Sequence, residues 1–526
     1  MGSQKDMESQ QGMDSHAAAS GKPASLWIAT APATEYPTLA GDIDVDVAII
    51  GGGIAGITAA HELKAAGRRV ALLEAGRLLQ GVTGQTTAKL TSQHTLIYSH
   101  LLQHFGEAKA RAYADANQAA LAHVAHTVET LGIDCDFRRR DAYTWADSDD
   151  DLARLHRETD AALKLALPAR FVEAAAVPLP FAVRGALCFA QQAQFHPLKY
   201  LQHLAWSIPG EGSHVFEHSP ALSVDDGEPA QVTTRQGRVR AGAVIIATHY
   251  PFTDHSLYAL RLSPYRHYLL AARLDAAAPD GMFINVARTR SLRPYPQEGA
   301  EGMLVVGEGH TVGEGGDTRG RYQRLETWAR SVLPVAGVDY HWSTHDHQSI
   351  DRVPYIGRLT PLSRHLYVAT GFGGWGMSNG IVAGLLLRDL VLGHENPWAE
   401  VFDPARLKLT GAGDFVRHTL TVGRHWVGDR LRRGHAALAP GEAGILATSQ
   451  GRLAVYRDEQ GVSHALSPAC THMGCVVQWN GAEKSWDCPC HGSRFDAISG
   501  AVLHGPAPAP LARRTLDTQG ERRQAG

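Results

Sequence analysis

The chain has 526 residues, which is enough for two or three domains, and its 44 % hydrophobic and 20 % charged residues are the balance of an ordinary globular protein. A net charge of -3 gives no support for nucleic-acid binding. The longest apolar helical stretch, residues 381–392, contains charged residues and is too short to cross a bilayer, so we expect no transmembrane segment.

Residues 1–25 are rich in Gln, Ser, Gly and Ala and have no apolar core. A secretory signal needs such a core, and a packed element needs apolar side chains to bury. We therefore expect a flexible tail at residues 1–25 and a cytoplasmic protein.

Residues 44–75 predict a βαβ unit. The apolar residues 45 and 47–50 indicate a buried strand, residues 54–66 a helix, and residues 69–74 a second strand. Two strands joined by a helix in this way are typical of a Rossmann-like nucleotide-binding domain, so we expect an α/β fold here.

The glycines of this unit fit the pattern G-x-G-x-x-G. Gly51 permits the tight turn, Gly53 lets the backbone approach a pyrophosphate, and Gly56 lets the helix pack closely on the strand. Glu74 ends the second strand, where it is placed to accept a hydrogen bond from a ribose hydroxyl. The pattern in this context predicts dinucleotide binding, against the alternative of a glycine-rich structural turn.

The polar segment 83–95 follows the βαβ unit. We expect it to lie along the cofactor, with Gly84, Thr86 and Thr87 as donors, or else to be a solvated surface loop. Residues 98–131 have a helical period and predict one long packing helix.

The middle of the chain predicts a second, mainly β region. Residues 232–234 and 239–241 alternate as in a hairpin, and residues 243–248 (AVIIAT) predict a buried strand. Residues 265–310 read as antiparallel strands separated by a turn-rich stretch at 293–302. We expect this sheet to face the substrate.

A second glycine cluster follows the strand at 366–370. Gly371, Gly373 and Gly376 match the dinucleotide pattern, but the helix after them is not followed by a second strand that ends in an acid. We therefore reject a separate nicotinamide site and expect this helix N-terminus to point at the first cofactor.

These motifs together resemble the D-amino-acid-oxidase-like family of FAD-dependent oxidoreductases over residues 26–405. The motifs are GGGIAG with Glu74, GVTGQTTA, AVIIAT, LRPYPQEGAEGMLVVGEGH, DRVPYIG and ATGFGGWGMSNG. The resemblance implies interleaved FAD-binding and substrate domains, with the C-terminal glycine segment against the isoalloxazine ring. The cofactor residues that we expect are Gly51, Gly53, Gly56, Glu74, Gly84, Thr86, Thr87, Gly371, Gly374, Gly376 and Met377.

Residues 406–435 are rich in Gly, His and Arg and predict a solvated linker. Beyond it, Cys470 and His472 form one box, and Cys488 and His491 a second. Two thiolates for one iron and two imidazoles for the other are the ligands of a Rieske [2Fe-2S] cluster. Zinc is the rival, but the spacing differs from its common boxes, and a structural cysteine knot is a further alternative.

The region 436–526 closely resembles the Rieske family, with GPAPAP similar to its proline loop. The resemblance implies an all-β domain in which Cys470 and Cys488 bind one iron and His472 and His491 the other. It also implies a disulfide between the remaining cysteines of the boxes, Cys475 and Cys490, which is unusual for a cytoplasmic protein. Phenylalanine stands at position 495 where high-potential members carry tyrosine, so we expect a low potential.

A flavin takes two electrons and releases them singly, whereas a nicotinamide cannot readily feed a one-electron cluster. We therefore expect FAD, a small-molecule donor, an amine or amino acid by resemblance, and an unknown one-electron acceptor. The alternatives are an NAD(P)H-linked reductase for a partner oxygenase and a non-enzymatic redox sensor. Candidate substrate-site residues are Arg293, whose fork suits a carboxylate, Tyr295, Tyr355 and Trp375, each with a structural role as its alternative.

Overall fold

A computed structural model describes residues 20–253, 258–297, 300–314, 316, 318–406, 438–448 and 451–516. Apart from Arg406, the expected linker lies outside these described residues. Residues 20–25, expected to belong to a flexible tail, instead pack on the protein, because β1 (Lys22–Pro23) pairs with Tyr340 and His341 and Ser25 caps the first helix. Among the described residues, no helix is long and apolar enough to span a membrane.

The first sheet is built on the predicted βαβ unit and has the order β17-β18-β11-β2-β3-β8, with β9 and β10 added beside β11. Its strands are β2 (Ile43–Ile50), β3 (Val70–Leu73), β8 (His214–Phe216), β9 (Ser223–Asp225), β10 (Ala230–Thr233), β11 (Arg238–Ile246), β17 (Tyr355–Arg358) and β18 (Leu366–Thr370). Strands β18, β11, β2, β3 and β8 run parallel to one another, so their carboxyl ends meet at one edge. The expected hairpin is confirmed by the antiparallel pairing of Val232 with Val239.

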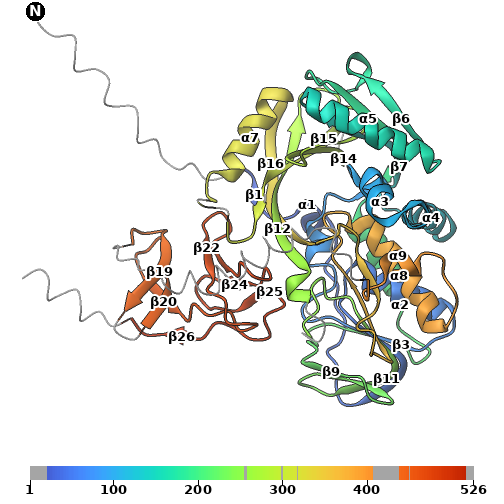
Figure 1. Cartoon of the computed structure of the whole chain (residues 1–526). Helices are drawn as coiled ribbons and strands as arrows, with labels where there is room; N and C mark the ends of the chain where they lie inside the picture. Colours follow the sequence, from blue (N-terminus) through green and yellow to red (C-terminus); the bar gives the residue numbers. More distant parts are fainter. Residues whose placement is uncertain are drawn as a thin grey trace, which may run out of the picture.

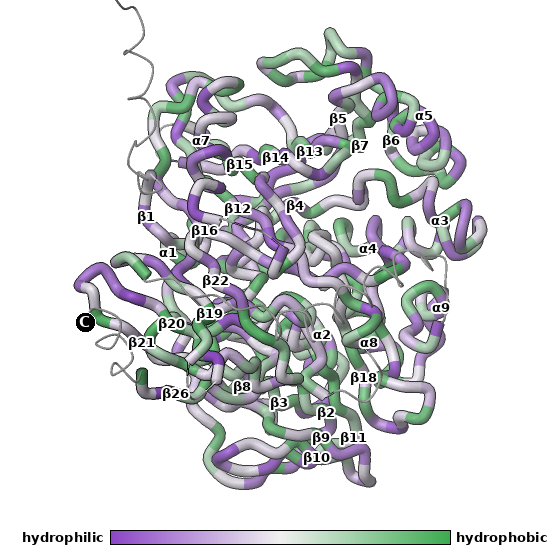
Figure 2. The backbone as a smooth tube through the Cα atoms, turned by 60° about the vertical axis from the view of Figure 1, so that its left-hand side comes forward, coloured by the Kyte–Doolittle hydropathy of each residue, from purple (hydrophilic) through white to green (hydrophobic). Residues whose placement is uncertain are grey.

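Two apolar helices, α2 (Ile54–Ala65) and α8 (Gly376–Leu392), pack against each other on this sheet, and both are largely hydrophobic along their length (Figure 2). A Cβ atom on Gly384 would lie 2.4 Å from Thr58 Cγ2, so glycine permits the close approach of the helices. Helix α8 begins at Gly376, five residues before the predicted start at residue 381.

The other helices cover the sheets. They are α1 (Leu26–Thr30), α3 (Ile97–Phe105), α4 (Glu107–Leu131), α5 (Asp149–Lys164), α6 (Pro197–Trp206), α7 (Arg321–Val332) and α9 (Ala399–Phe402). The prediction of one helix over residues 98–131 is wrong, because Gly106 has φ +83° and ψ 167°, a conformation that ends α3 and starts α4.

The second sheet is mainly antiparallel and has the order β1-β16-β12-β15-β14-β13-β5-β7-β4, with β6 paired to β7. Its strands after β1 are β4 (Lys89–Leu90), β5 (Arg138–Ala146), β6 (Ala169–Glu173), β7 (Gly185–Gln194), β12 (Leu262–Leu274), β13 (Met282–Asn285), β14 (Arg290–Gln297), β15 (Ala300–Thr311) and β16 (Val335–Ser349). The predicted antiparallel sheet is thus confirmed, but most of the stretch 293–302 is strand rather than turn.

The C-terminal residues form a separate all-β lobe, red in Figure 1, with two four-stranded antiparallel sheets. One sheet contains β19 (Ala443–Thr448), β20 (Gly451–Arg457), β21 (Ser463–Leu466) and β26 (Arg513–Arg514), and the other β22 (Gln478–Asn480), β23 (Ser485–Asp487), β24 (Arg494–Asp496) and β25 (Val502–His504). We call this unit the cluster lobe. Its core contains Trp486, Phe495 and the four cysteines of the two boxes.

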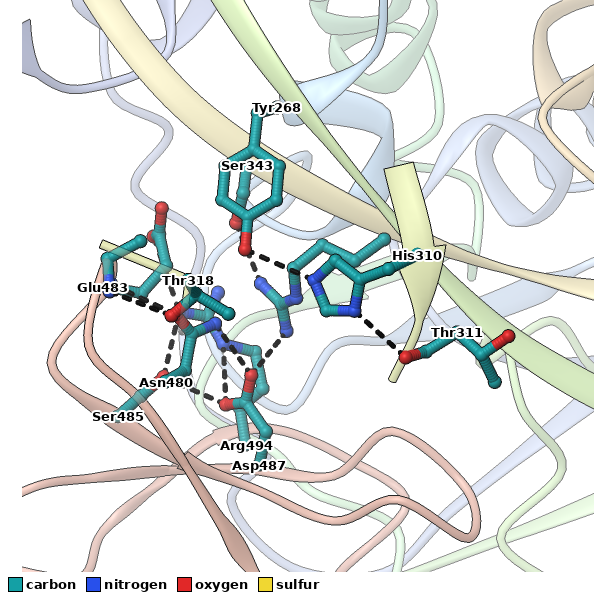
Figure 3. Close-up of polar contacts among 12 residues, drawn as sticks. Tyr268, His310, Thr311, Thr318, Ser343, Asn480, Glu483, Ser485, Asp487 and Arg494 are labelled. Atoms are coloured by element: carbon teal, nitrogen blue, oxygen red, sulfur yellow. Dashed lines mark hydrogen bonds and ion pairs between the residues drawn. The ribbon is translucent and has the colours of Figure 1, made fainter. Parts of the chain in front are cut away.

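The cluster lobe is held on the larger unit by a buried ion pair. Arg266 on β12 donates from Nη2 to Asp487 Oδ2 at 2.8 Å, and the two side chains are 0 % and 6 % exposed. Asn480 and Ser485 of the lobe also donate to Asp487, which fixes the carboxylate (Figure 3). Arg266 further donates to Ser343 Oγ at 2.7 Å, so each charge has partners on its own side of the interface.

Polar contacts surround the pair. Thr318 Oγ1 donates to Asn480 Oδ1 at 3.0 Å and accepts from the Ala482 amide at 3.2 Å, and Tyr322 donates its hydroxyl to Glu483. Because buried charges need both a counter-charge and hydrogen bonds, this network ties the position of the lobe to a few side chains.

We predict that Arg266→Met destabilises docking of the lobe by about 1.5–3 kcal/mol, because it removes the charged hydrogen bond across the interface and leaves Asp487 only Arg494 of its own lobe, 3.5 Å away, as a cation. Hydrogen exchange of β23 and the thermal unfolding of the full chain measure the effect. Lys484→Met is the matched control, since its ion pair with Glu459 is exposed and contributes below about 1 kcal/mol. Equal protection of β23 in both variants would contradict the role of the pair.

Candidate functional site

A cavity of about 920 Å³ lies where the carboxyl edge of the first sheet, the second sheet and the cluster lobe meet. The larger unit contributes the glycine-rich turn after β2, the loop around residues 80–87, and the start of α8. The lobe contributes His472, Met473 and residues 502–508. One cavity therefore borders both of the sites that the sequence predicts.

The turn after β2 lines the cavity with its backbone, and glycine allows it to pack closely on the end of β11. Gly51 has φ +111°, and a Cβ atom there would lie 2.4 Å from the Ala247 carbonyl oxygen. Gly53 caps the N-terminus of α2, and Thr83 Oγ1 accepts from the Ile54 amide at 3.1 Å. Helix N-termini of this kind attract phosphate groups.

Glu74 is held rigidly beside this turn. Its two carboxylate oxygens accept from the backbone amides of Gly52 at 2.8 Å and Gly76 at 2.9 Å. Burial raises the pKa of Glu74, although these amides act in the opposite direction. The carboxylate keeps further lone pairs that can accept from a ribose hydroxyl.

The predicted cofactor residues divide into two groups. Those that line the cavity are Gly51, Gly53, Glu74, Thr86, Thr87, Gly374, Gly376 and Met377. Gly56, Gly84 and Gly371 do not line it, and packing or backbone geometry explains each one. A Cβ atom on Gly56 would lie 2.0 Å from the Gly51 carbonyl oxygen, one on Gly84 would lie 2.1 Å from the Leu79 carbonyl oxygen, and Gly371 has φ +78°.

Of the candidate substrate residues, only Trp375 lines the cavity, where its ring stacks on His94 with centroids 4.7 Å apart. Arg293 is buried elsewhere: it donates to the Phe195 carbonyl oxygen and lies 4.9 Å from the centre of the Trp27 ring. Tyr295 lies in the core, and Tyr355 lies between the guanidinium groups of Arg261 and Arg406. The structural alternative therefore holds for Arg293, Tyr295 and Tyr355.

Several polar residues of the cavity were not identified from the sequence. Arg288 donates to the Gly373 carbonyl oxygen at 2.6 Å and lies 5.6 Å from the Trp375 ring, and burial lowers its pKa. Lys89 donates to the Phe283 carbonyl oxygen and Ser291 Oγ, and burial, with Arg293 nearby, lowers the pKa of Lys89 to about 7. His249 and Asp346 also line the cavity.

In the cluster lobe, the side chains of the two boxes converge. The Cys470 and Cys488 thiols hydrogen-bond to each other, which lowers the pKa of Cys470 to about 7 and raises that of Cys488. The Nδ1 atoms of His472 and His491 are 3.2 Å apart. A pair of thiols beside a pair of imidazole nitrogens is the donor set of a Rieske cluster, so the residues fit this group.

Two further features hold the boxes together. A disulfide joins Cys475 and Cys490, as the resemblance implies, with their Cα atoms 6.5 Å apart. Ser493 Oγ accepts from the Ala507 amide at 3.1 Å, which ties the second box to the proline-rich loop.

Aromatic and imidazole rings connect the boxes to the cavity. The Tyr250 ring, which lines the cavity, lies 5.8 Å from the His472 ring and 5.3 Å from the His491 ring. His347 Nε2 donates to the His491 carbonyl oxygen at 3.1 Å. His472 therefore borders the cavity, and Tyr250, which lines the cavity, contacts the ring of His491.

Comparison with known proteins identifies two families along the chain. A model of the FAD dependent oxidoreductases matches residues 46–390, and a model of the Rieske [2Fe-2S] domain matches residues 434–515. The putative Rieske 2Fe-2S iron-sulfur protein YhfW of Bacillus subtilis (strain 168) is 37 % identical over 502 residues, which are 94 % of this chain and 98 % of that protein.

Two more distant proteins match the larger unit. The gamma-glutamylputrescine oxidoreductase of Escherichia coli (strain K12) is 25 % identical over 380 residues, which are 70 % of this chain and 87 % of that protein. The crystal structure of glycine oxidase from Geobacillus kaustophilus has a TM-score of 0.59 at 20 % identity and covers 69 % of this chain and 99 % of its own. This last likeness shows a shared fold.

The loop beside the cavity offers a matched pair of glycines. Gly84→Ala places a Cβ atom against the Leu79 carbonyl oxygen, whereas Gly81 has nothing within 4 Å of its Cβ position. We predict that Gly84→Ala lowers stability by about 1–3 kcal/mol and reduces bound FAD per chain, and that Gly81→Ala stays within about 0.5 kcal/mol of the parent. Thermal unfolding and flavin absorbance measure both, and identical behaviour of the two variants would refute the packing role of Gly84.

Proposed function

The chain belongs to the FAD-dependent oxidoreductases and carries a C-terminal Rieske [2Fe-2S] domain, and on this basis we propose that it oxidises a small amine or amino acid and passes the electrons singly to the cluster. FAD and a [2Fe-2S] cluster are the cofactors of the two families. FAD supplies two-electron chemistry that can be discharged in single steps, which a one-electron centre requires. A separate one-electron acceptor then reoxidises the chain.

The observation that carries this proposal is that both predicted sites border one cavity. The glycine-rich turn and Trp375 lie on its walls together with His472 of the cluster lobe. The buried Arg266–Asp487 pair holds the lobe in this position. In the proposed arrangement, Cys470 and Cys488 would bind one iron and His472 and His491 the other, and His472 is the one of these four residues that lines the cavity.

The donor class is inferred from the relatives and from the cavity residues. The Escherichia coli relative is named for gamma-glutamylputrescine, and the glycine oxidase for an amino acid. Arg288 supplies a cation for a donor carboxylate, in place of Arg293, and Trp375 supplies an aromatic wall. Lys89 is the residue that we propose as proton acceptor, because a neutral amine that donates two hydrogen bonds keeps one lone pair.

We predict that kcat/KM for the amine donor rises as the pH increases through about 7, the pKa of Lys89, because the amine accepts a proton only when it is neutral. Lys89→Met should flatten this rise and lower the rate above pH 7 by about 100-fold or more. Lys64→Met, which removes a surface lysine of α2, is the control and keeps the profile. If the rise in kcat/KM persists unchanged in Lys89→Met, the titrating group is the amine of the donor. This result would contradict the role of Lys89 as proton acceptor.

The direction of electron flow is tested by anaerobic stopped-flow mixing with a panel of amines, amino acids and hydroxy acids. We predict that the flavin absorbance bleaches first and that the EPR signal of the reduced cluster follows. In Cys488→Ser, which lacks an iron ligand of the proposed set, the flavin should bleach without a later cluster signal.

NADH and NADPH are the matched probes for the reductase alternative. They should leave the flavin oxidised under the same conditions, since no second complete βαβ unit follows residues 371–376. Reduction of the cluster before the flavin, or bleaching by a pyridine nucleotide and by none of the organic donors, would overturn the proposal.

A further inference from the structure

Three histidines from distant parts of the sequence meet at the edge of the cavity. His249 follows β11, His345 lies on β16, and His504 ends β25 of the cluster lobe. Each offers one ring nitrogen, and these three atoms all lie within 4.8 Å of one another. The three rings are inclined at 74° to 79° to one another rather than stacked. None of the three belongs to the proposed ligands of the iron-sulfur cluster.

The hydrogen bonds of His249 direct a lone pair toward His504. His249 Nε2 donates to Asp346 Oδ1 at 2.9 Å, because a carboxylate there accepts, and this leaves Nδ1 unprotonated in the neutral ring. Nδ1 in turn lies 3.4 Å from His504 Nε2. Asp346 is itself fixed by the Gly374 amide at 2.6 Å. A histidine that donates its second nitrogen to a fixed carboxylate is the arrangement that orients metal-binding imidazoles.

The other two imidazoles are also suited to metal binding. His345 is 2 % exposed, and its Nε2 has no hydrogen-bond partner among the described residues. A buried polar atom without a partner is unfavourable, and a ligand removes the penalty. Burial lowers the pKa of both His345 and His504, so these rings are neutral near pH 7, the form that binds a metal.

We propose that His249, His345 and His504 bind one divalent transition-metal ion of the Zn²⁺ class. Nitrogen ligands lie about 2.0–2.1 Å from Zn²⁺, and two such ligands at a tetrahedral angle are roughly 3.3–3.4 Å apart. The 3.4 Å separation of His249 Nδ1 and His504 Nε2 matches this value. Three imidazoles with a carboxylate behind one of them favour zinc over the oxygen-seeking ions Mg²⁺ and Ca²⁺.

The site joins the two parts of the protein. His249 and His345 belong to the larger unit and His504 to the cluster lobe, so a bound ion acts as a clamp between them. His249 and His504 also line the cavity, so the fourth position of a tetrahedral ion opens toward it. The inference does not depend on the direction of electron flow, and a measurement of metal binding alone tests it.

Metal analysis of the full-length protein tests the site directly. Elemental analysis should find one zinc per chain in addition to the two irons of the cluster. After treatment with a chelator that leaves the EPR signal of the cluster unchanged, titration of Zn²⁺ against a chromophoric chelator should reveal one tight site. Added Zn²⁺ should also raise the unfolding temperature, because it binds the folded chain. The iron content of each sample excludes zinc in an empty cluster site.

Variants assign the ligands. Asp346→Asn should weaken zinc binding by about 10- to 100-fold, and His504→Gln and His345→Gln should weaken it further. His464→Gln, in the same lobe but paired with Asp458, and His310→Gln, bonded to Tyr268, are the matched controls and should bind zinc as the parent does.

Two results would overturn the inference. One is full-length protein that contains two irons and binds no Zn²⁺, in which case the three rings form a hydrogen-bonded network alone. The other is zinc binding that His504→Gln and Asp346→Asn leave unchanged. The first result is obtained with the unmodified protein, so it can refute the proposal even if a variant fails to fold.

Discussion

The ion pair between Arg266 and Asp487 is the contact on which the rest of the arrangement depends. It is buried at the junction of two units that otherwise have separate cores, and a charge in such a place is tolerated only with its partner present. The pair and its hydrogen bonds join β12 to β22 and β23 of the lobe, and in this position His472 lies on the wall of the cavity.

The larger unit brings backbone atoms to the wall of the cavity, where a large anionic cofactor is expected to bind. At Gly51 and Gly53 the backbone itself forms the wall of the cavity, whereas Gly56 and Gly384 allow close packing, of α2 on the turn after β2 and of α8 on α2. Glu74 is then fixed by two backbone amides rather than by another side chain. Main-chain atoms therefore shape the part of the cavity around the glycine-rich turn, whereas the side chains of Arg288 and Trp375 shape the part at the start of α8.

This division explains what could be predicted from the sequence. The glycine pattern and the cysteine and histidine boxes are local, so their spacing indicated the two sites, and the resemblance to the Rieske family implied the disulfide. Arg293, Tyr295 and Tyr355 do not line the cavity, because the face of a strand that meets the cavity depends on how distant elements pack. For the same reason, the sequence gives no sign that His249 and His504, which lie 255 positions apart, meet in space. The break at Gly106 was foreseeable in principle, since glycine is a poor residue for a helix interior.

Residues 502–508 make the wall of the cavity partly a product of the cluster lobe. The shape of the cavity therefore depends on residues of both the larger unit and the cluster lobe. A substitution in the proline-rich loop at residues 505–508 changes the same cavity that Gly51, Gly53 and Trp375 line, so the two units constrain each other's sequence there.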